Sequence, residues 1–364
     1  MKKLGIAIIV LCLVVAVSFI GVGCGTATTA GATTAAAAET TAAAAETTAA
    51  AAATTANAAE TTAAVVASKE LKIVHIPKVV HPWFEIVQVG AAAMAKYLTE
   101  NTNTKVSVEY IAPATADVAE QNNIVEQAVA KGCTSIFIDP LDEQGNKQVF
   151  DEARAKGVLI TVYDCSPFGD YTSVAASAVD SATYELKRLM SLIGEKGKVA
   201  VMQGMPTSPS HKQRYDVLME ALKAYPNVTV VDGGVDNDDM ETARQQGSAT
   251  LAANPDLVGY LGCDAAFPVG VSQAIKEAGK VGKIQVVGLG EMVSILDYIK
   301  EGVLESTVYV APDQQGAYSV MLHYMANAGF YTQGIQIPKF IDIGCSYIDK
   351  TNVDPYIAKF TVKK

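Results

Sequence analysis

Residues that form metal sites and disulfides are scarce in this sequence. Its 364 residues include four histidines and six cysteines, with no C-x-x-C pair and no His/Cys spacing typical of a metal site. We therefore expect neither a metal nor a cofactor. Basic side chains are also few, because 28 lysines and arginines stand against 38 acids, for a net charge of −10. The chain has no basic stripe to displace counterions, which excludes nucleic acid as a partner.

Motifs of common enzyme classes are missing as well. The sequence contains no G-x-S-x-G elbow and no Walker loop. Residues 288–293, GLGEMV, carry only two of the three glycines of a dinucleotide-binding G-x-G-x-x-G motif and occur late in the chain. We therefore expect a protein that is not an enzyme.

The first 69 residues differ in composition from the rest. Residues 1–23 join two lysines to a long apolar run, which is the pattern of an export signal peptide. The next residue, Cys24, resembles the cysteine of the bacterial lipobox, so we expect a lipid anchor there, on the outer face of the cell membrane. Gly21 departs from the lipobox pattern, which leaves an uncleaved signal anchor as the alternative. Residues 24–69 are nearly all Ala and Thr and predict a tether, or a frayed alanine-rich helix that also acts as a spacer.

From residue 70 onward, short β-branched runs alternate with amphipathic stretches of helical period. This alternation predicts parallel sheets with crossover helices, in α/β architecture. About nine or ten such units are too many for one sheet of ordinary width, so two doubly wound lobes are favoured over a (β/α)8 barrel. The predicted strands are 71–76, 106–111, 135–138, 158–163, 198–202, 228–231, 258–261 and 284–287, and the predicted helices include 83–99, 117–130, 181–193, 212–224, 240–252 and 265–278.

Ligands of open parallel sheets bind beyond the carboxyl ends of the strands, and those positions are polar or aromatic here. Aromatic rings can cover the C–H faces of a sugar while carboxylates bind its hydroxyl groups. The pattern therefore predicts a site for a small polyhydroxylated molecule. The candidate ligand-binding residues are Lys78, His81, Trp83, Phe84, Asp139, Asp164, Arg214, Cys263, Asp264 and Glu291.

At these residues the chain resembles the ribose-type periplasmic sugar-binding proteins, the type I solute-binding family of ABC importers. The similarity covers nearly all of 72–364. The segment 81–84, His-Pro-Trp-Phe, is similar to the family's Asn-Pro-Phe-Phe motif, and Asp164 matches its sugar-binding Asp. Asp139 stands at the family's strand-end Asn, and Arg214 matches an arginine of the second lobe.

Several positions depart from the family pattern. Cys165 stands where an arginine usually follows the sugar-binding Asp, and Cys263-Asp264 stands where the family has Asn-Asp. The family's Gly-Phe-Asp motif is Gly-Leu-Gly at 288–290, so Glu291 is the candidate substitute for the missing acid. The Ile76-Pro77-Lys78 turn resembles the branch that contains rhamnose-binding and autoinducer-2-binding proteins, in which the lysine points into the cleft.

The resemblance implies a function and a domain plan. An N-terminal lobe would comprise 70–176 plus 311–344, and a C-terminal lobe 177–310 plus 345–364, joined by three crossovers. The protein would capture a monosaccharide, a pentose or a deoxyhexose such as rhamnose, and deliver it as a monomer to an ABC permease. The alternatives are a receptor for an autoinducer-2-type signal molecule, or an exported sugar-modifying enzyme with Asp139 and Asp164 as acid and base.

Ordinary structural roles compete for the same residues. Asp164 and Asp264 are also good helix caps, Asp139 before a proline fits a turn, and Arg214 has acids nearby for a surface ion pair. Trp83 could simply pack in the core. The cysteines of the mature chain after Cys24 are widely spaced, and we expect buried thiols with no pairing deducible from the sequence: Cys133, Cys165, Cys263 and Cys345.

Overall fold

The computed structural model describes residues 70–331 and 336–361. The predicted signal peptide, the predicted lipid site at Cys24 and the predicted tether lie outside the described residues. Among the helices that are described, none has both the length and the apolar character needed to cross a bilayer.

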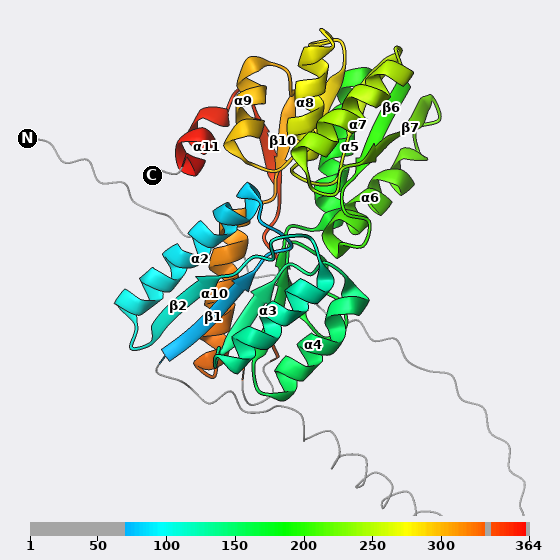
Figure 1. Cartoon of the computed structure of the whole chain (residues 1–364). Coiled ribbons are helices and arrows are strands. Elements are labelled where there is room, and N and C mark those ends of the chain that lie inside the picture. The colour runs from blue at the N-terminus through cyan, green and yellow to red at the C-terminus, as the bar shows by residue number, and fades with distance from the viewer. Residues whose placement is uncertain (1–69, 332–335, 362–364) are drawn as a thin grey trace, which may run out of the picture. The chain divides into compact units, whose positions relative to one another are not determined.

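Two six-stranded sheets form the framework of the described chain (Figure 1). All strand pairs of the first sheet are parallel. Its strands, in spatial order, are β11 (Phe340–Asp342), β5 (Thr172–Ala175), β4 (Leu159–Tyr163), β3 (Ser135–Ile138), β1 (Glu70–Ile76) and β2 (Lys105–Tyr110).

The second sheet repeats this plan, except that its edge strand β12 is antiparallel to β10. The remaining pairs of this sheet are parallel. Its strands, in spatial order, are β12 (Ser346–Asp349), β10 (Ser306–Tyr309), β9 (Gln285–Leu289), β8 (Leu257–Leu261), β6 (Gly197–Gln203) and β7 (Val228–Val235).

Helices cover both faces of each sheet, because alternate strand residues are apolar in both directions. In β6, Val199 and Val201 belong to the core under α5 and α6, whereas Ala200 and Met202 belong to the core on the opposite face. The helices are α2 (Pro82–Asn101), α3 (Val118–Ala130), α4 (Glu143–Ala155) and α10 (Pro312–Asn327) on the first sheet, and α5 (Ala178–Ile193), α6 (Pro209–Leu222), α7 (Met240–Ala253), α8 (Phe267–Glu277), α9 (Val293–Glu301) and α11 (Val353–Phe360) with the second.

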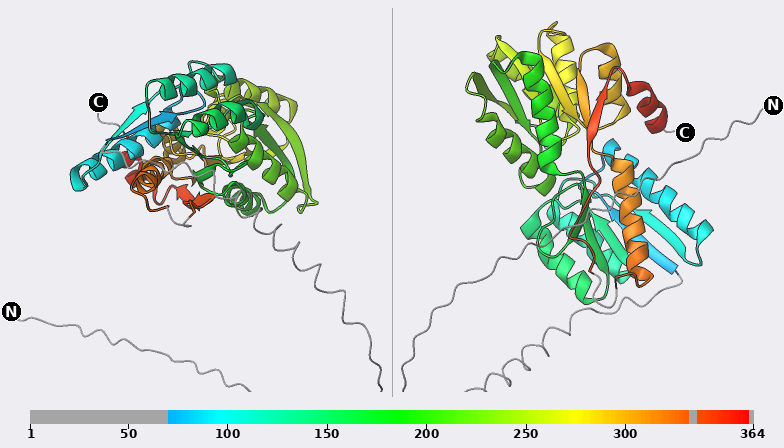
Figure 2. Two further views of the ribbon diagram at one scale, coloured as in Figure 1. Left: turned by 90° about the horizontal axis from the view of Figure 1, so that it is seen from below. Right: turned by 180° about the vertical axis from the view of Figure 1, so that it is seen from behind.

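The chain passes between the two sheets three times (Figure 2). The passages follow β5, β10 and β11, and two of them contain a residue with a left-handed backbone. Ala311 has φ 52° and Gly344 has φ 71°. A left-handed alanine is strained, so the surrounding contacts must hold the passage at Ala311 in place.

The prediction of two doubly wound parallel-sheet lobes is confirmed, and the alternative barrel is wrong because each sheet is open at two edge strands. The eight predicted strands are present within two residues of their expected starts. Strands β5, β10, β11 and β12 were not predicted. Each has only three or four residues, and β5 and β10 contain serine and threonine, so no apolar run marks them.

Helices α2 and α10 lie side by side at unusually short range, although they are far apart in the sequence. A Cβ atom on Gly90 of α2 would lie 1.8 Å from the carbonyl oxygen of Asp313. A Cβ atom on Gly316 of α10 would lie 2.0 Å from the carbonyl oxygen of Val87. Backbone therefore packs directly on backbone, which only glycine permits.

We predict that Gly90→Ala and Gly316→Ala each lower the free energy of unfolding by about 1–3 kcal/mol or more, because the new methyl group forces the helices apart. Helix propensity alone predicts the opposite sign, a gain of about 1 kcal/mol. The measurement is urea unfolding of the two variants. Gly247→Ala on α7 is the control, since its Cβ would meet only side-chain atoms and the Cα of Val271, at 3.3–3.5 Å. Stabilisation by either substitution would contradict this account of the contact.

Candidate functional site

Both sheets have a point where the strand order reverses, and the polar residues collect at the carboxyl ends of the strands there. In the first sheet the reversal lies between β1 and β3, and in the second between β6 and β8. Loops leaving these strands carry Lys78 and Asp139 on one side and Asp264 on the other. Each of the three side chains is buried.

Lys78 reaches from the first sheet to residues at the start of α6. Its Nζ atom lies 3.2 Å from Oδ2 of Asp139, donates to Oγ of Ser210 at 2.9 Å and contacts Nε2 of His211 at 2.8 Å. Burial lowers the pKa of Lys78, but the charges of Asp139, Asp238 and Asp164 together outweigh burial and raise it. Burial raises the pKa of Asp139 to about 8, although the Lys78 ammonium opposes this shift.

The contacts of His211 are not all satisfied. Its Nδ1 accepts a hydrogen bond from the backbone N–H of Met205 at 2.9 Å. A neutral imidazole has one acceptor nitrogen, so Nε2 then carries a proton and faces the ammonium of Lys78. Burial lowers the pKa of His211 well below its ordinary value, so the ring stays neutral. The contact between Lys78 and His211 therefore places donor against donor.

Arg214 of α6 forms a buried ion pair with Asp164, which follows β4. Nη2 of Arg214 lies 2.6 Å from Oδ1 of Asp164 and also donates to the Asp164 carbonyl oxygen at 3.2 Å. Nη1 lies 3.4 Å from Oδ2, so the guanidinium engages both carboxylate oxygens. Asp164 adopts a left-handed backbone with φ 59°, which aspartate tolerates better than most residues. The proposed surface ion pair of Arg214 is wrong, as is a helix-capping role for Asp164, which lies beyond β4 at no helix start.

The aromatic residues at the start of α2 are buried on the first-sheet side. The indole N–H of Trp83 donates to Oε2 of Glu291 at 2.9 Å, and the backbone N–H of Val310 donates to Oε1. Phe84 packs edge-on against Trp83 with ring centroids 5.3 Å apart. His81 caps α2, because its Nδ1 accepts from the backbone N–H of Trp83 at 3.3 Å.

Three acids of the second sheet complete the arrangement, and two of them were not predicted. Oδ1 of Asp264 accepts from the backbone N–H groups of Ala266 and Phe267 just before and at the start of α8, although the cap position of that helix is Ala266. Asp236 and Asp238 follow β7. The predicted strand ended at residue 231, five residues short of Asp236, so the two acids did not stand at a strand end. Recognising that the strand continues through Gly233-Gly234 would have found them.

His211, Asp238 and Asp264 place possible metal-ligand atoms within 4.8 Å of one another. These residues do not fit a metal ion. Nδ1 of His211 already accepts from the Met205 N–H, and Nε2 carries the ring proton, so neither nitrogen offers a free lone pair. The Lys78 ammonium also occupies the approach and would repel a cation.

These groups enclose a small cavity of about 20 Å³, lined by Lys78, His81, Trp83, Phe84, Asp164, His211, Arg214, Asp238, Asp264, Ala265 and Leu289. Seven of the ten predicted ligand-binding residues are among them. Asp139 lies directly behind at ion-pair distance from Lys78, Glu291 accepts from the indole N–H of Trp83, and the thiol of Cys263 accepts from the Gly204 N–H. The cavity holds no more than one water molecule, far below the roughly 300 Å³ of a small ligand pocket.

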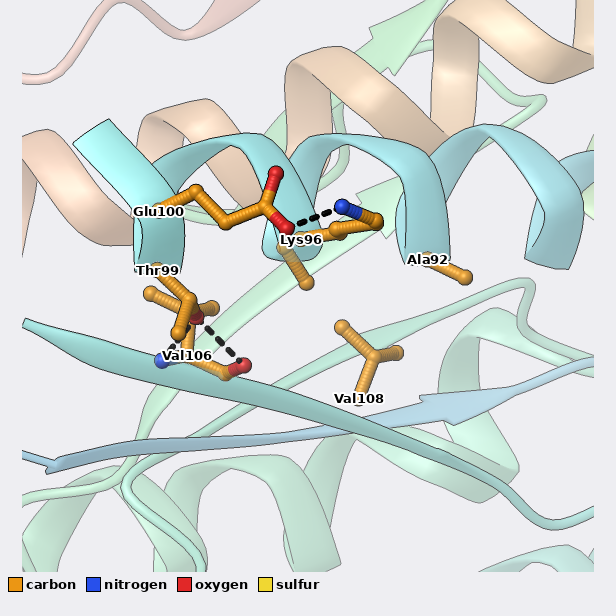
Figure 3. A pocket seen from close by; sticks show the side chains of 7 residues that line it. Ala92, Lys96, Thr99, Glu100, Val106 and Val108 are labelled. Carbon is orange, nitrogen blue, oxygen red and sulfur yellow. Dashed lines mark hydrogen bonds and ion pairs between the residues drawn. The ribbon is translucent and has the colours of Figure 1, made fainter.

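A larger hollow of about 350 Å³ lies elsewhere, between α2 and the edge strand β2 (Figure 3). Its polar residues are Lys96, Thr99 and Glu100, and Lys96 is paired with Glu100. The hollow begins at Ala92, ten residues along α2 from Pro82, hence about 15 Å from the polar cluster. None of the residues that line the small cavity also lines this hollow.

The four cysteines in the described residues are all free. Cys165 and Cys263 are buried as expected, and burial raises the pKa of both thiols well above its ordinary value. Cys133 and Cys345 are only half-buried, which corrects the expectation for those two positions. Cys133 stands just before β3, and Cys345 lies in the passage between β11 and β12.

We predict that Glu291 makes stability fall with rising pH. Burial raises its pKa to about 8, whereas an unfolded glutamate ionises near about 4.3. Between these values unfolding releases a proton, so the free energy of unfolding decreases as the pH increases. Melting temperatures from pH 5 to 8 should fall less steeply in Glu291→Gln than in the wild type. The exposed control Glu220→Gln should keep the wild-type slope, and equal slopes for Glu291→Gln would overturn the assignment.

Comparison with known proteins places this arrangement in a family. A family model described as "Periplasmic binding protein domain" matches residues 73–329. The D-apiose import binding protein of Actinobacillus succinogenes is 23% identical over 309 residues, which cover 82% of this chain and 94% of that protein. The D-ribose/D-allose-binding protein of Pseudomonas aeruginosa is 23% identical over 221 residues, covering 58% and 69%.

Solved structures agree in fold. An ABC transporter solute-binding protein from Agrobacterium vitis with bound D-fucose has a TM-score of 0.72 and 27% identity, covering 79% of this chain and 99% of that one. A solute-binding protein from Actinobacillus succinogenes with bound D-allose has a TM-score of 0.71 and 22% identity, covering 79% and 100%. The predictions of a type I solute-binding protein, and of a binding protein rather than an enzyme, are confirmed. The chain belongs to the periplasmic binding protein domain family.

Proposed function

We propose that this protein captures a monosaccharide outside the cytoplasm and delivers it to an ABC importer in the membrane. The observation that carries the proposal is the meeting of polar side chains from both sheets in one cavity, at the strand ends where such folds bind ligands. Trp83 and Phe84 offer ring surfaces, and Asp164 and Arg214 offer charged hydrogen-bonding groups. This combination suits a molecule with alternating C–H and hydroxyl faces.

We propose a pentose or a deoxyhexose such as rhamnose as the cargo. One relative named above is a D-apiose import binding protein, and D-apiose has five carbons. One structure named above contains D-fucose, which is a deoxyhexose. Both sugars are smaller or less polar than a full hexose. A compact ligand is also consistent with the close approach of the two sides of the cavity.

We further propose that the cavity fills by opening of the two lobes. A cavity with room for one water molecule cannot admit a sugar. The two sides of the cavity must therefore separate for the sugar to enter and then close again. The lobes would be 70–176 plus 311–344 and 177–310 plus 345–364, with motion about the three passages. The closed form with ligand would then be the form that the permease recognises, and one copy of the chain would suffice.

The second candidate is a receptor for an autoinducer-2-type signal molecule. It is favoured by one feature, the lysine after β1, because Lys78 is buried in the cavity wall instead of lying in solvent. An exported sugar-modifying enzyme is not proposed. Its acid and base would be Asp139 and Asp164, and both are committed to ion pairs, with Lys78 and Arg214.

We predict that one monosaccharide raises the melting temperature of the full chain, since a ligand that binds only the folded state stabilises it by mass action. Asp164→Asn should weaken that binding by about 10- to 100-fold, because a hydrogen bond to a charged group is lost. The measurement is a thermal-shift screen followed by calorimetric titration. Asp170→Asn is the control, since Asp170 is exposed and its ion pair is with the exposed Lys339. No shift with any sugar, but one with borate-supplemented autoinducer precursor, would favour the second candidate.

We also propose that Cys24 carries a lipid that holds the protein on the outer face of the cell membrane. The support is the apolar run of residues 1–23 and the cysteine that follows it. We predict that Cys24→Ala moves the chain from the membrane fraction to the soluble fraction when cleavage still occurs, or leaves it uncleaved in the membrane. Metabolic labelling with a radioactive fatty acid measures the modification directly. Cys12→Ala, within the apolar run, should still be labelled, and a labelled Cys24→Ala protein would refute the anchor.

A further inference from the structure

Glu291 stands behind the cavity and is held by the second sheet. It follows β9, is buried, and is not among the residues that line the cavity. The preceding residue fixes its loop to β10, because the Gly290 N–H donates to the carbonyl oxygen of Val308 at 3.1 Å. The hydroxyl group of Thr307 also donates to the Gly290 carbonyl oxygen, at 2.8 Å. The backbone at Glu291 is therefore positioned by contacts within the second sheet.

The two carboxylate oxygens of Glu291 bind two different parts of the protein. Oε2 accepts from the indole N–H of Trp83 at 2.9 Å, and Oε1 accepts from the backbone N–H of Val310. Trp83 belongs to α2 on the first sheet and lines the cavity. Val310 stands directly after β10, where the chain passes from the second sheet to α10 (Figure 2). One side chain thus joins the cavity wall to the passage.

This passage is also held from the first-sheet side. The side-chain amide of Gln315 donates to the Val310 carbonyl oxygen at 2.9 Å, and the Gln315 backbone N–H donates to the Ala311 carbonyl oxygen at 2.9 Å. Gln315 belongs to α10 and is buried. The backbone of Val310 is therefore bound by Glu291 on one side and by Gln315 on the other, next to the left-handed Ala311. Such a strained residue persists only where its surroundings hold it.

Only one of the two bonds of Glu291 joins the two lobes proposed above. Trp83 belongs to the N-terminal lobe, whereas Val310 belongs to the same lobe as Glu291. Separation of the lobes would take the indole away from Oε2 and leave the carboxylate with one fewer donor in a buried place. The side chain would then no longer be fixed at both oxygens, so its bond to the Val310 N–H would weaken as well.

We propose that Glu291 is a positioning residue that couples the ring of Trp83 to the passage at Val310. A ligand that holds the ring in the cavity wall would thereby also hold the passage, without touching Glu291. This inference rests on the proposed function, because motion of the lobes about the passages is part of it. It adds a route by which an occupied cavity acts on one of those passages.

The test measures Val310 after a change at Trp83, in the full chain without ligand. Trp83→Phe keeps an aromatic ring but removes the N–H that binds Glu291. We expect the amide of Val310 to exchange its hydrogen about threefold faster or more, because its acceptor is less firmly held. The measurement is hydrogen exchange followed by mass spectrometry of peptides that span 306–315. Trp83 and Val310 share no direct hydrogen bond, so a local change at Val310 reports the coupling.

A double variant shows whether the effect passes through Glu291. Glu291→Ala removes the acceptor of Val310 and should speed the exchange by itself. Adding Trp83→Phe to Glu291→Ala should then speed it no further, since the bond that Trp83 acts through is already missing. Glu291→Gln is measured as well, because it keeps the volume of the side chain but offers one acceptor oxygen to two donors.

Fluorescence gives the converse readout, from Glu291 to the ring. Trp83 is the single tryptophan of the sequence, so tryptophan emission comes from this ring alone. We expect acrylamide to quench it about twofold faster or more in Glu291→Ala, because the ring spends more time away from the cavity wall. The control is Glu185→Gln. Glu185 of α5 is also buried, but it accepts from the Gly262 N–H of the second sheet, so both readouts should stay as in the wild type.

The outcomes separate this inference from a general loss of stability and from the proposed function. Peptides of β6 report unfolding of the second sheet as a whole, and an equal rise there in Trp83→Phe would overturn the coupling. Unchanged exchange at Val310 in Trp83→Phe, or additive effects in the double variant, would also overturn it and leave the proposed function intact. No sugar enters the test, so failure of every sugar to bind would count against the proposed function alone.

Discussion

The buried ion pair between Asp164 and Arg214 is the interaction on which the rest of the cleft depends. Asp164 follows β4 of the first sheet, and Arg214 belongs to α6, which packs with the second sheet. Removing each charge from water costs several kcal/mol. That cost is offset only when the guanidinium and carboxylate meet with their other hydrogen bonds in place. A partly formed ion pair would therefore be unfavourable, so the two sides of the cavity favour either full contact or full separation. The bonds from Lys78 to Ser210 and from Trp83 to Glu291 need the same approach of the two sides.

Several polar groups around the cavity lack a suitable hydrogen-bond partner among the described residues. Lys78 and the Met205 N–H both point donors at one neutral imidazole, Nε of Arg214 has no partner among the described residues, and neither has Nε2 of His81. Buried polar groups without partners each cost about 1–3 kcal/mol. A ligand that supplies the missing acceptors and donors would therefore stabilise this arrangement more than the open form proposed above. A difference of this kind is what allows a small molecule to shift the population between two forms.

Much of the fold follows from the sequence, while only part of the site does. The long apolar strands and their helices were predictable, because each carries a clear period and the order of the elements implies parallel sheets. Lys78 and Asp164 were found because they stand just after such strands, and Trp83 because it begins the helix that follows the first of them. Asp236 and Asp238 were missed because β7 continues through two glycines, which have no side chain to mark a strand. The pairing of Arg214 with Asp164 was also beyond reach, since it joins residues whose proximity is set by the packing of two sheets.

The close packing of Gly90 on Asp313 and of Gly316 on Val87 bears on the order in which the chain folds. Helix α10 completes the first sheet's apolar face, yet it is synthesised after nearly all of the second sheet. The first lobe therefore cannot bury that face until most of the chain has emerged, and its contacts are long-range ones that form slowly.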